Sequence, residues 1–395
     1  MVANENERPF LLELLQEPIS TKLQYFRDVI VPHRNIRQIL EELTKNAQEP
    51  DDALVYFVFG VTGVGKTRLK EEFEKRLLKH FMDEILENPG SLIVGTIEVD
   101  SAEGGKFNYS DYYIQVLESL KEVLISYKED YGITGTQEKD SDALLGTFES
   151  KNSKALRRAM QKVFINRQLK AFTLDEAQHL FDVAGGRQLQ TQMNWIKSIA
   201  NKTSTVHVLF GTYELLNCQK VNGQVGRRSE DYHLARYRTN HEKDKENKAD
   251  IFEFNKVILT LQQHLPVLEE PQLEKHWEYF MKYSVGCVGV LKNWWYRSLK
   301  KALDENAKTV RMKDFQAKEP SAGRRKRIRE EAEKGERDLA ELYREDEDSL
   351  KSKPVEELPP QPKSRNRKVG ERKPTRDLVG RNQDDEELEI NQGDE

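Results

Sequence analysis

Gly60-Val-Thr-Gly-Val-Gly-Lys-Thr67 is the stretch of this 395-residue sequence that determines its fold. It follows residues 54–59, LVYFVF, an apolar run whose β-branched and aromatic content favours a buried strand. Residues 68–78 come next and have the 3.6-residue period of a helix. A strand, a glycine-rich loop ending in Lys-Thr and a helix form the setting that a nucleotide-binding P-loop requires. The alternative is a strand-to-helix turn that merely needs glycines.

Each part of this loop has a physical role in holding phosphate. The glycines let the backbone curl so that its N–H groups face a phosphate, and the helix N-terminus adds a partial positive charge. Lys66 can reach the β- and γ-phosphates, and Thr67 can ligate Mg²⁺. We therefore predict that ATP and Mg²⁺ bind here. The predicted nucleotide-binding residues are Gly60, Val61, Thr62, Gly63, Val64, Gly65, Lys66, Thr67 and Arg68.

A second apolar run ends in two acidic residues. Residues 170–176, KAFTLDE, indicate a strand with Asp175 and Glu176 at its tip. Asp175 beside the P-loop can hold Mg²⁺ through water, and Glu176 can polarise the attacking water. The alternative is an ordinary strand end with acidic residues. Downstream of a P-loop, the pair predicts a site of ATP hydrolysis.

A third strand is predicted at residues 205–210, TVHVLF, and Thr212 follows its tip. There Thr212 can touch the γ-phosphate or the attacking water, although it could equally cap the helix that starts at residue 213. Further strands are expected at 92–99 and 232–237. Because these strands alternate with helical segments, we predict an α/β fold with a parallel sheet flanked by helices.

The composition sets the broad class of protein. The chain is 37% hydrophobic and 33% charged, and its net charge of −5 gives no global nucleic-acid signal, so any basic surface must be local. Cys218 and Cys287 are the only cysteines, which supports neither a disulfide framework nor a zinc site. No apolar run approaches transmembrane length, and the polar N-terminus lacks a signal-peptide core. We expect a soluble cytoplasmic protein with no membrane partner.

Changes in pattern along the chain predict four parts. They are an N-terminal extension (1–45), a RecA-like nucleotide-binding domain (46–240), a small α-helical lid (241–317) and a disordered charged tail (318–395). A charged linker is expected at 239–250, with the lid helices starting at 251. The tail is basic at 323–329 and potentially helical at 330–349. We expect disorder there because so charged a segment cannot bury enough apolar surface to offset its ordering entropy.

A P-loop, an acidic strand end, a polar strand tip, an arginine pair and a helical lid, in this order, resemble an AAA+ ATPase. More specifically, the chain resembles the TnsC/TniB regulators of bacterial DNA transposition over roughly residues 25–316. The stretches that carry the likeness are Phe59-Gly-Val-Thr-Gly-Val-Gly-Lys-Thr67, Leu174-Asp-Glu-Ala-Gln178, Leu209-Phe-Gly-Thr-Tyr-Glu-Leu215, Ser284-Val-Gly-Cys-Val-Gly289 and Val31-Pro-His33.

The resemblance implies an ATPase that assembles head-to-tail into rings or filaments on double-stranded DNA, and that works with a transposase and a target-selection protein. It also implies that Arg227 or Arg228 acts as an arginine finger in the nucleotide site of the neighbouring subunit, for which a guanidinium is suited. A solvated surface arginine pair is the alternative. The candidate DNA-facing residues are Lys106, Lys154, Arg157 and Arg158. Lys292 stands where many AAA+ proteins carry a second sensor arginine.

Two other functions compete with this one. Asp175-Glu-Ala-Gln-His179 resembles a helicase box, but a helicase needs a second RecA-like domain, and only the helical segment and the tail follow. A signalling or sensor NTPase that forms rings without binding DNA is the stronger alternative, because the fold alone does not specify a function.

Overall fold

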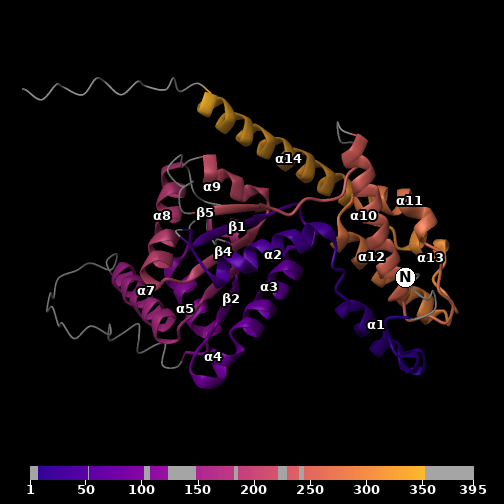
Figure 1. Cartoon of the computed structure of the whole chain (residues 1–395), viewed down its shortest axis with the longest axis horizontal. Helices are drawn as coiled ribbons and strands as arrows, with labels where there is room; N and C mark the ends of the chain where they lie inside the picture. Colours follow the sequence, from indigo (N-terminus) through magenta and orange to yellow (C-terminus); the bar gives the residue numbers. More distant parts are fainter. Residues whose placement is uncertain are drawn as a thin grey trace, which may run out of the picture. The chain divides into compact units, whose positions relative to one another are not determined.

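The strand that precedes the P-loop belongs to a five-stranded parallel sheet (Figure 1). Strand β1 (Val55–Phe59) pairs with β4 (Val206–Gly211) on one side and with β5 (Ser229–His233) on the other. Strand β3 (Ala171–Asp175) lies between β4 and β2 (Val94–Glu98), which gives the order β2-β3-β4-β1-β5. The carboxyl ends of β3, β4 and β1 therefore lie side by side, and each precedes a predicted site residue.

This computed structural model describes residues 8–51, 53–101, 107–122, 148–181, 186–220, 229–239 and 244–351. The chain divides into two compact units, residues 1–344 and 345–395. Of the second unit only residues 345–351, the last residues of helix α14, are described. Among the described helices, none combines the length and the apolar character that a bilayer crossing requires.

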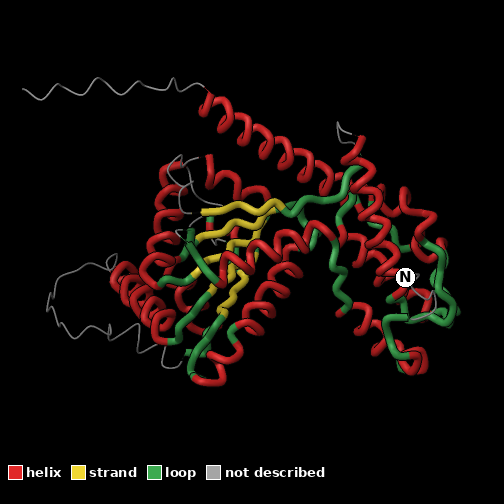
Figure 2. The backbone as a smooth tube through the Cα atoms, in the orientation of Figure 1, coloured by secondary structure: helices red, strands yellow, loops and turns green. Residues whose placement is uncertain are grey.

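Helices cover the strands of the sheet, which are yellow in Figure 2. Helix α3 begins in the P-loop and packs beside α2, and α5, α7 and α8 form a second group (Figure 1). The helices before the lid are α1 (Ile19–Asp28), α2 (Arg34–Gln48), α3 (Lys66–His80), α4 (Met82–Glu87), α5 (Tyr109–Ser119), α7 (Phe148–Asn166), α8 (Gly186–Thr203) and α9 (Asn217–Lys220), with short 3-10 turns at Leu12–Gln16, Ala177–Leu180 and Tyr213–Leu216. Strands β1, β3 and β4 are buried throughout, as the middle of a sheet covered on both faces requires, whereas the edge strands β2 and β5 are partly exposed.

The lid has a separate hydrophobic core. Its helices are α10 (Asp244–Gln263), α11 (Trp277–Ser284), α12 (Val288–Asp304) and α13 (Met312–Ala317), with a short 3-10 turn at Glu274–His276. Trp294 and Trp295 are fully buried there beside Phe280 and Phe315. Phe26 of α1 belongs to the same cluster, so the N-terminal helix packs with the lid helices rather than with the sheet.

Two predicted boundaries differ from the structure. Strand β5 begins at Ser229, three residues before the predicted start, and pairs with β1 through His233. Helix α10 begins at Asp244, inside the segment expected to be a charged linker. The carboxylate of Asp250, which is buried, accepts hydrogen bonds from Arg34 (2.5 Å) and from the backbone N–H of Arg238 (2.9 Å). A charged residue that the sequence assigns to a linker is thus a buried helix residue with two partners.

The predicted start of the disordered tail at residue 318 is corrected by helix α14 (Ala322–Lys351). Ile328, Ala332 and Leu339 of this helix are buried in the same hydrophobic cluster as the sheet. Each large apolar side chain buried in this way stabilises the folded chain by about 1.5–3 kcal/mol. The sparse apolar residues of α14 therefore suffice for packing because they share one face. Residues 352–395 lie outside the described part of the chain.

Candidate nucleotide-binding site

The P-loop has the backbone conformation that its glycines permit. Gly63 and Gly65 have φ of 80° and 123°, in the region that residues with a side chain rarely adopt. A Cβ on Gly60 would lie 2.5 Å from the carbonyl oxygen of Leu234. Helix α3 starts at Lys66, at the end of the loop. The N–H groups of its first turn have no hydrogen-bond partner within the helix and are available at this end of the loop. The chain between β1 and α3 therefore has the backbone geometry of an anion-binding loop.

The ammonium group of Lys66 is held inside this loop. Its Nζ donates hydrogen bonds to the carbonyl oxygens of Gly60 (2.8 Å) and Val61 (3.3 Å). Burial lowers the pKa of Lys66, and the carboxylates of Glu176, Glu331 and Asp175 act in the opposite direction. A buried ammonium that rests on two backbone carbonyls can exchange them for phosphate oxygens without a change in fold. The residue thus fits its predicted partner, a nucleotide phosphate.

The acidic pair lies at the end of β3. Asp175 is buried, and its Oδ1 accepts a hydrogen bond of 3.0 Å from the backbone N–H of Glu176. Glu176 has φ of 49°, a left-handed conformation that costs a non-glycine residue roughly 1–2 kcal/mol. This conformation turns the chain sharply after the strand and leaves the Glu176 side chain partly exposed. Strain of this kind is concentrated at functional sites.

Gln178 connects Glu176 to the neighbouring strand end, a role that the sequence analysis did not predict. Its Nε2 donates to Oε2 of Glu176 (2.6 Å), and its Oε1 accepts from the backbone N–H of Thr212 (3.2 Å). The side chain is buried. Thr212 itself precedes the 3-10 turn Tyr213–Leu216, and its side chain caps no backbone N–H of that turn. The structure therefore links two predicted site residues, Glu176 and Thr212, through one amide.

The lid contacts the P-loop at the start of α12. The backbone N–H of Val290 donates to the carbonyl oxygen of Gly63 (3.1 Å), and a Cβ on Gly289 would lie 2.5 Å from that same oxygen. On the other side of the loop, Ile36 of α2 lies 3.3 Å from where a Cβ of Gly65 would be. Glycine at positions 63 and 289 is thus what allows the lid and the loop to approach so closely.

Arg68 and Lys292 meet at the end of α1. The Nζ of Lys292 donates to the carbonyl oxygens of Arg27 (2.6 Å) and Val29 (2.5 Å), and Arg68 donates to the same Arg27 oxygen (3.0 Å). Burial lowers the pKa of Lys292 to about 8, and the Arg68 charge acts in the same direction. Both cations therefore hold the N-terminal helix in this structure. A role for Lys292 in place of a sensor arginine stays a prediction.

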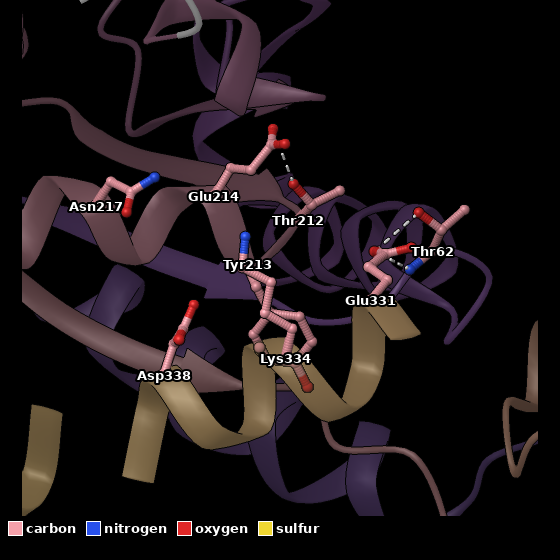
Figure 3. A pocket seen from close by; sticks show the side chains of 9 residues that line it. Thr62, Thr212, Tyr213, Glu214, Asn217, Glu331, Lys334 and Asp338 are labelled. Atoms are coloured by element: carbon pink, nitrogen blue, oxygen red, sulfur yellow. Dashed lines mark hydrogen bonds between the residues drawn. The ribbon is translucent and has the colours of Figure 1, made fainter. Parts of the chain in front are cut away.

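Helix α14 also reaches the site. The carboxylate of Glu331 accepts hydrogen bonds from the backbone N–H (2.8 Å) and the hydroxyl (3.1 Å) of Thr62 (Figure 3). A cavity of about 380 Å³ adjoins this contact. It is lined by Thr62, Thr212, Tyr213, Glu214, Asn217, Glu331, Lys334, Gly335 and Asp338. Thr62 of the loop and Thr212 of the strand end thus face one space together with α14.

The donor set fits Mg²⁺ bound together with a nucleotide. Among the described residues, no three metal-ligating side chains converge. Mg²⁺ at phosphate sites is held by one or two protein oxygens, with phosphates and waters completing the octahedron. Thr67, exposed at the start of α3, and Asp175 at the end of β3 are the residues that would supply those protein ligands.

Other predicted residues lie away from these contacts or outside the described chain. Arg227, Arg228 and Lys106 fall outside the described residues. Lys154 and Arg158 are exposed on α7. Arg157, on the same helix, donates to the hydroxyl of Ser198 (3.1 Å).

Part of the chain is similar to a known family of proteins. Residues 48–219 match the family model described as "AAA domain". A comparison with curated protein sequences gave no match. Solved structures with a similar fold include the ORC2 protein of Aeropyrum pernix (14% identity, 75% of this chain and 72% of that chain, TM-score 0.47) and the Aeropyrum pernix ORC1 protein in complex with DNA (15%, 75% and 68%, 0.45). Another is the Walker-type ATPase paby2304 of Pyrococcus abyssi (15%, 83% and 81%, 0.39).

The P-loop, the acidic strand end and the parallel sheet give this part of the chain the fold of an AAA+ P-loop NTPase. Residues 48–219, from the end of α2 to α9, are its AAA domain. The predicted fold, a parallel sheet flanked by helices around a P-loop, is confirmed.

Proposed function

We propose that this ATPase is a regulator of DNA transposition of the TnsC/TniB kind. It binds ATP with Mg²⁺, assembles as a homo-oligomer on double-stranded target DNA, and recruits or activates a transposase. Hydrolysis of ATP then drives disassembly. One observation carries this proposal: the motifs behind the resemblance converge on one site. Gln178 of the stretch Leu174–Gln178 binds Thr212 of the stretch Leu209–Leu215, and Gly289 of the lid junction abuts Gly63 of the P-loop.

The proposal gives each site residue a task. Lys66 would exchange its loop carbonyls for the β- and γ-phosphates, and Thr67 and Asp175 would hold Mg²⁺, which would supply positive charge beside the phosphate oxygens. Glu176, oriented by Gln178, polarises the attacking water. In the proposal, Thr212 contacts the γ-phosphate or the attacking water. None of these side chains forms a covalent bond, so catalysis is positioning and electrostatic stabilisation.

Assembly enters through the arginine pair. In the proposal, Arg227 or Arg228 of one subunit completes the site of its neighbour, so that hydrolysis requires contact between copies. An arginine supplied by a neighbour raises turnover of P-loop enzymes by about 10³–10⁵-fold. The nucleotide site then reports whether a neighbour is present, which is what a regulator that works as an assembly needs.

The DNA-binding part of the proposal rests on local basic residues, because the net charge of the chain is −5. Lys154 and Arg158 on α7 are exposed and suited to phosphate contacts. Arg157 already donates to Ser198, so the free contacts are assigned to the other two residues. Lys106 remains a candidate from the sequence.

A salt titration of DNA binding tests this proposal. The protein is mixed with labelled duplex DNA and a non-hydrolysable ATP analogue at several salt concentrations. We expect binding that requires the analogue and weakens with salt. Lys154→Ala/Arg158→Ala should reduce the slope of log K against log salt by about 1.8, the loss of two phosphate contacts. Lys75→Ala, an exposed lysine on α3, is the matched control.

The outcomes separate the competing functions. Lys66→Ala removes the ammonium proposed to bind phosphate. It should abolish the DNA binding that requires the analogue, while the protein stays folded. If the protein binds the analogue but does not bind DNA, the result would favour the signalling NTPase over the transposition regulator. DNA binding that is equally strong without nucleotide would contradict the proposed coupling between ATP binding and DNA binding.

A further inference from the structure

Helix α14 contributes an anion to the P-loop. The P-loop N–H groups are the groups that cradle phosphate oxygens in nucleotide-binding proteins. In this structure the N–H of Thr62 is taken by a carboxylate oxygen of Glu331, which lies 269 residues further along the chain. A carboxylate oxygen on a P-loop N–H stands in for a phosphate oxygen. Figure 3 shows Glu331 directed at Thr62 from α14.

The helix is held in this position by an ion-pair network. The guanidinium of Arg236 donates two hydrogen bonds to the carboxylate of Glu336 (2.9 and 3.1 Å), and Arg238 adds a third (3.3 Å). The Arg236 and Glu336 side chains are only 10% and 13% exposed, so solvent screens this pair weakly. The bidentate geometry fixes the rotation of α14 and thereby the direction of Glu331.

A glycine brings α14 close to the strand end. A Cβ on Gly335 would lie 2.1 Å from Cγ of Tyr213, so the bare backbone of the helix rests on the tyrosine ring. The ring itself is fixed, because it is buried and its hydroxyl shares a hydrogen bond of 2.7 Å with Nε2 of His233. Only glycine permits this approach at position 335. The contact lies one residue beyond Thr212, at the edge of the proposed γ-phosphate space.

The charges in this space oppose a triphosphate. Among the described residues that line the cavity, Glu331, Glu214 and Asp338 are acidic and Lys334 is the one cation. Glu331 also acts on the charge of Lys66, which places its carboxylate within electrostatic reach of the phosphate-binding ammonium. A γ-phosphate that enters beside Thr212 adds negative charge to this space. ADP, which lacks that phosphate, adds less.

We propose that α14 is an autoinhibitory strap, and that Glu331 is a residue that disfavours ATP relative to ADP. Binding of ATP breaks the contact between Glu331 and Thr62, and α14 moves off the P-loop. This inference rests on the proposed ATP site and adds to it a control by the chain's own C-terminal helix. An ATPase with such a strap stays in its resting state until ATP displaces α14 from the P-loop.

Two variants and one control test the strap in the full-length protein. Glu331→Gln keeps the shape and still accepts a hydrogen bond from Thr62, but it removes the charge. Gly335→Ala places a Cβ against the Tyr213 ring and favours the helix itself by about 1 kcal/mol, so α14 must shift while it stays helical. Gly323→Ala is the matched control on the same helix, where an added Cβ meets nothing within 4 Å.

The measurement is the ratio of the dissociation constants for fluorescent ATP and ADP analogues, with melting curves to verify folding. We expect Glu331→Gln and Gly335→Ala each to tighten ATP binding by about fivefold relative to ADP, the effect of one like charge at a partly exposed site. Gly323→Ala should leave the ratio unchanged. In the Gly335→Ala background, Glu331→Gln should add little, because the strap has already moved.

An unchanged ratio in both variants would overturn the strap, as would equal changes for ATP and ADP. If Gly335→Ala lowers the melting temperature strongly, the Glu331→Gln ratio alone decides, because that variant preserves the packing of α14. These outcomes are distinct from failure of the proposed function. A protein that binds ATP with the predicted ratio but never binds DNA keeps the strap and loses the transposition role.

Discussion

The side-chain amide of Gln178 donates a hydrogen bond of 2.6 Å to the carboxylate of Glu176. The same amide accepts the backbone N–H of Thr212 through its oxygen. A side chain that binds the carboxylate proposed to polarise water with one end and the neighbouring strand end with the other fixes their relative position. Where catalysis depends on the position of the catalytic groups, such a link affects the rate of hydrolysis without contacting the nucleotide.

Removal of this link should slow hydrolysis and leave nucleotide binding intact. In Gln178→Ala we expect turnover to fall by roughly tenfold or more, because Glu176 loses its orientation. The partly buried N–H of Thr212 also loses its acceptor, which should cost about 1 kcal/mol of stability. Phosphate release, analogue titration and urea unfolding measure the three quantities. An unchanged turnover number would show that Gln178 does not position the catalytic carboxylate.

Glu176→Gln should separate binding from hydrolysis. The amide preserves the shape of the side chain but polarises water poorly, so turnover should fall by orders of magnitude, on the scale of lost water-positioning groups. ATP binding should persist, and DNA-bound assemblies should last longer because hydrolysis no longer dissolves them. Rates of phosphate release and of assembly decay check both effects. Normal phosphate release from this variant would place the catalytic carboxylate elsewhere.

Stability should fall at mildly acidic pH because of buried histidines. Burial lowers the pKa of His207 on β4 to about 4, and His33 and His233 are lowered to the same range for the same main reason. The unfolded chain, with histidine pKa near 6.5, therefore binds more protons than the folded chain between about pH 6.5 and 4. The stability that each neutral ring contributes is complete above pH 6.5. It is lost as pH falls, by roughly 3 kcal/mol per residue at pH 4.

Urea unfolding at pH 7.5 and pH 5 measures this loss. His207→Gln should reduce the difference in unfolding free energy between the two pH values. His276→Gln changes an exposed ring on the lid and serves as the control. If His207→Gln retains the whole pH dependence of the wild-type protein, protonation of His207 does not contribute to acid unfolding.

The arginine pair should act between subunits. ATPase activity per molecule should rise with protein concentration and with DNA, because neighbours complete each other's sites. Arg227→Ala/Arg228→Ala should bind ATP and hydrolyse it poorly. Mixing this double variant with Lys66→Ala protein should partly restore turnover, since one supplies arginines and the other an intact P-loop. Two results together would contradict arginines that act between subunits: residual rates that simply add across the mixing ratios, and wild-type activity that is independent of concentration.

Local patterns made much of the fold predictable. The P-loop, Asp175 and Glu176 were predicted because a glycine loop and an acidic strand end are encoded in neighbouring residues. The parallel arrangement of the strands followed from their alternation with helices, and the structure confirms it. The boundaries of β5 and α10 were less accurate, because tertiary contacts such as those of Asp250 override local polarity.

The contacts of α14 could not be predicted from composition. Its charge suggested disorder, yet Ile328, Ala332, Gly335 and Leu339 recur at intervals of four, three and four residues, the spacing of one helical face. That periodicity was the signal available in the sequence. The pairing of Glu331 with Thr62 was beyond reach, because the two residues are 269 positions apart and only the fold brings them together.

Electron microscopy of the protein with duplex DNA, with and without a non-hydrolysable ATP analogue, tests the central claim most directly. The claim is that ATP makes this protein assemble on DNA. We expect rings or filaments on the DNA when the analogue is present, and none with wild-type protein lacking nucleotide or with Lys66→Ala. Assemblies that form equally well without nucleotide, or rings that form with the analogue but never on DNA, would contradict it.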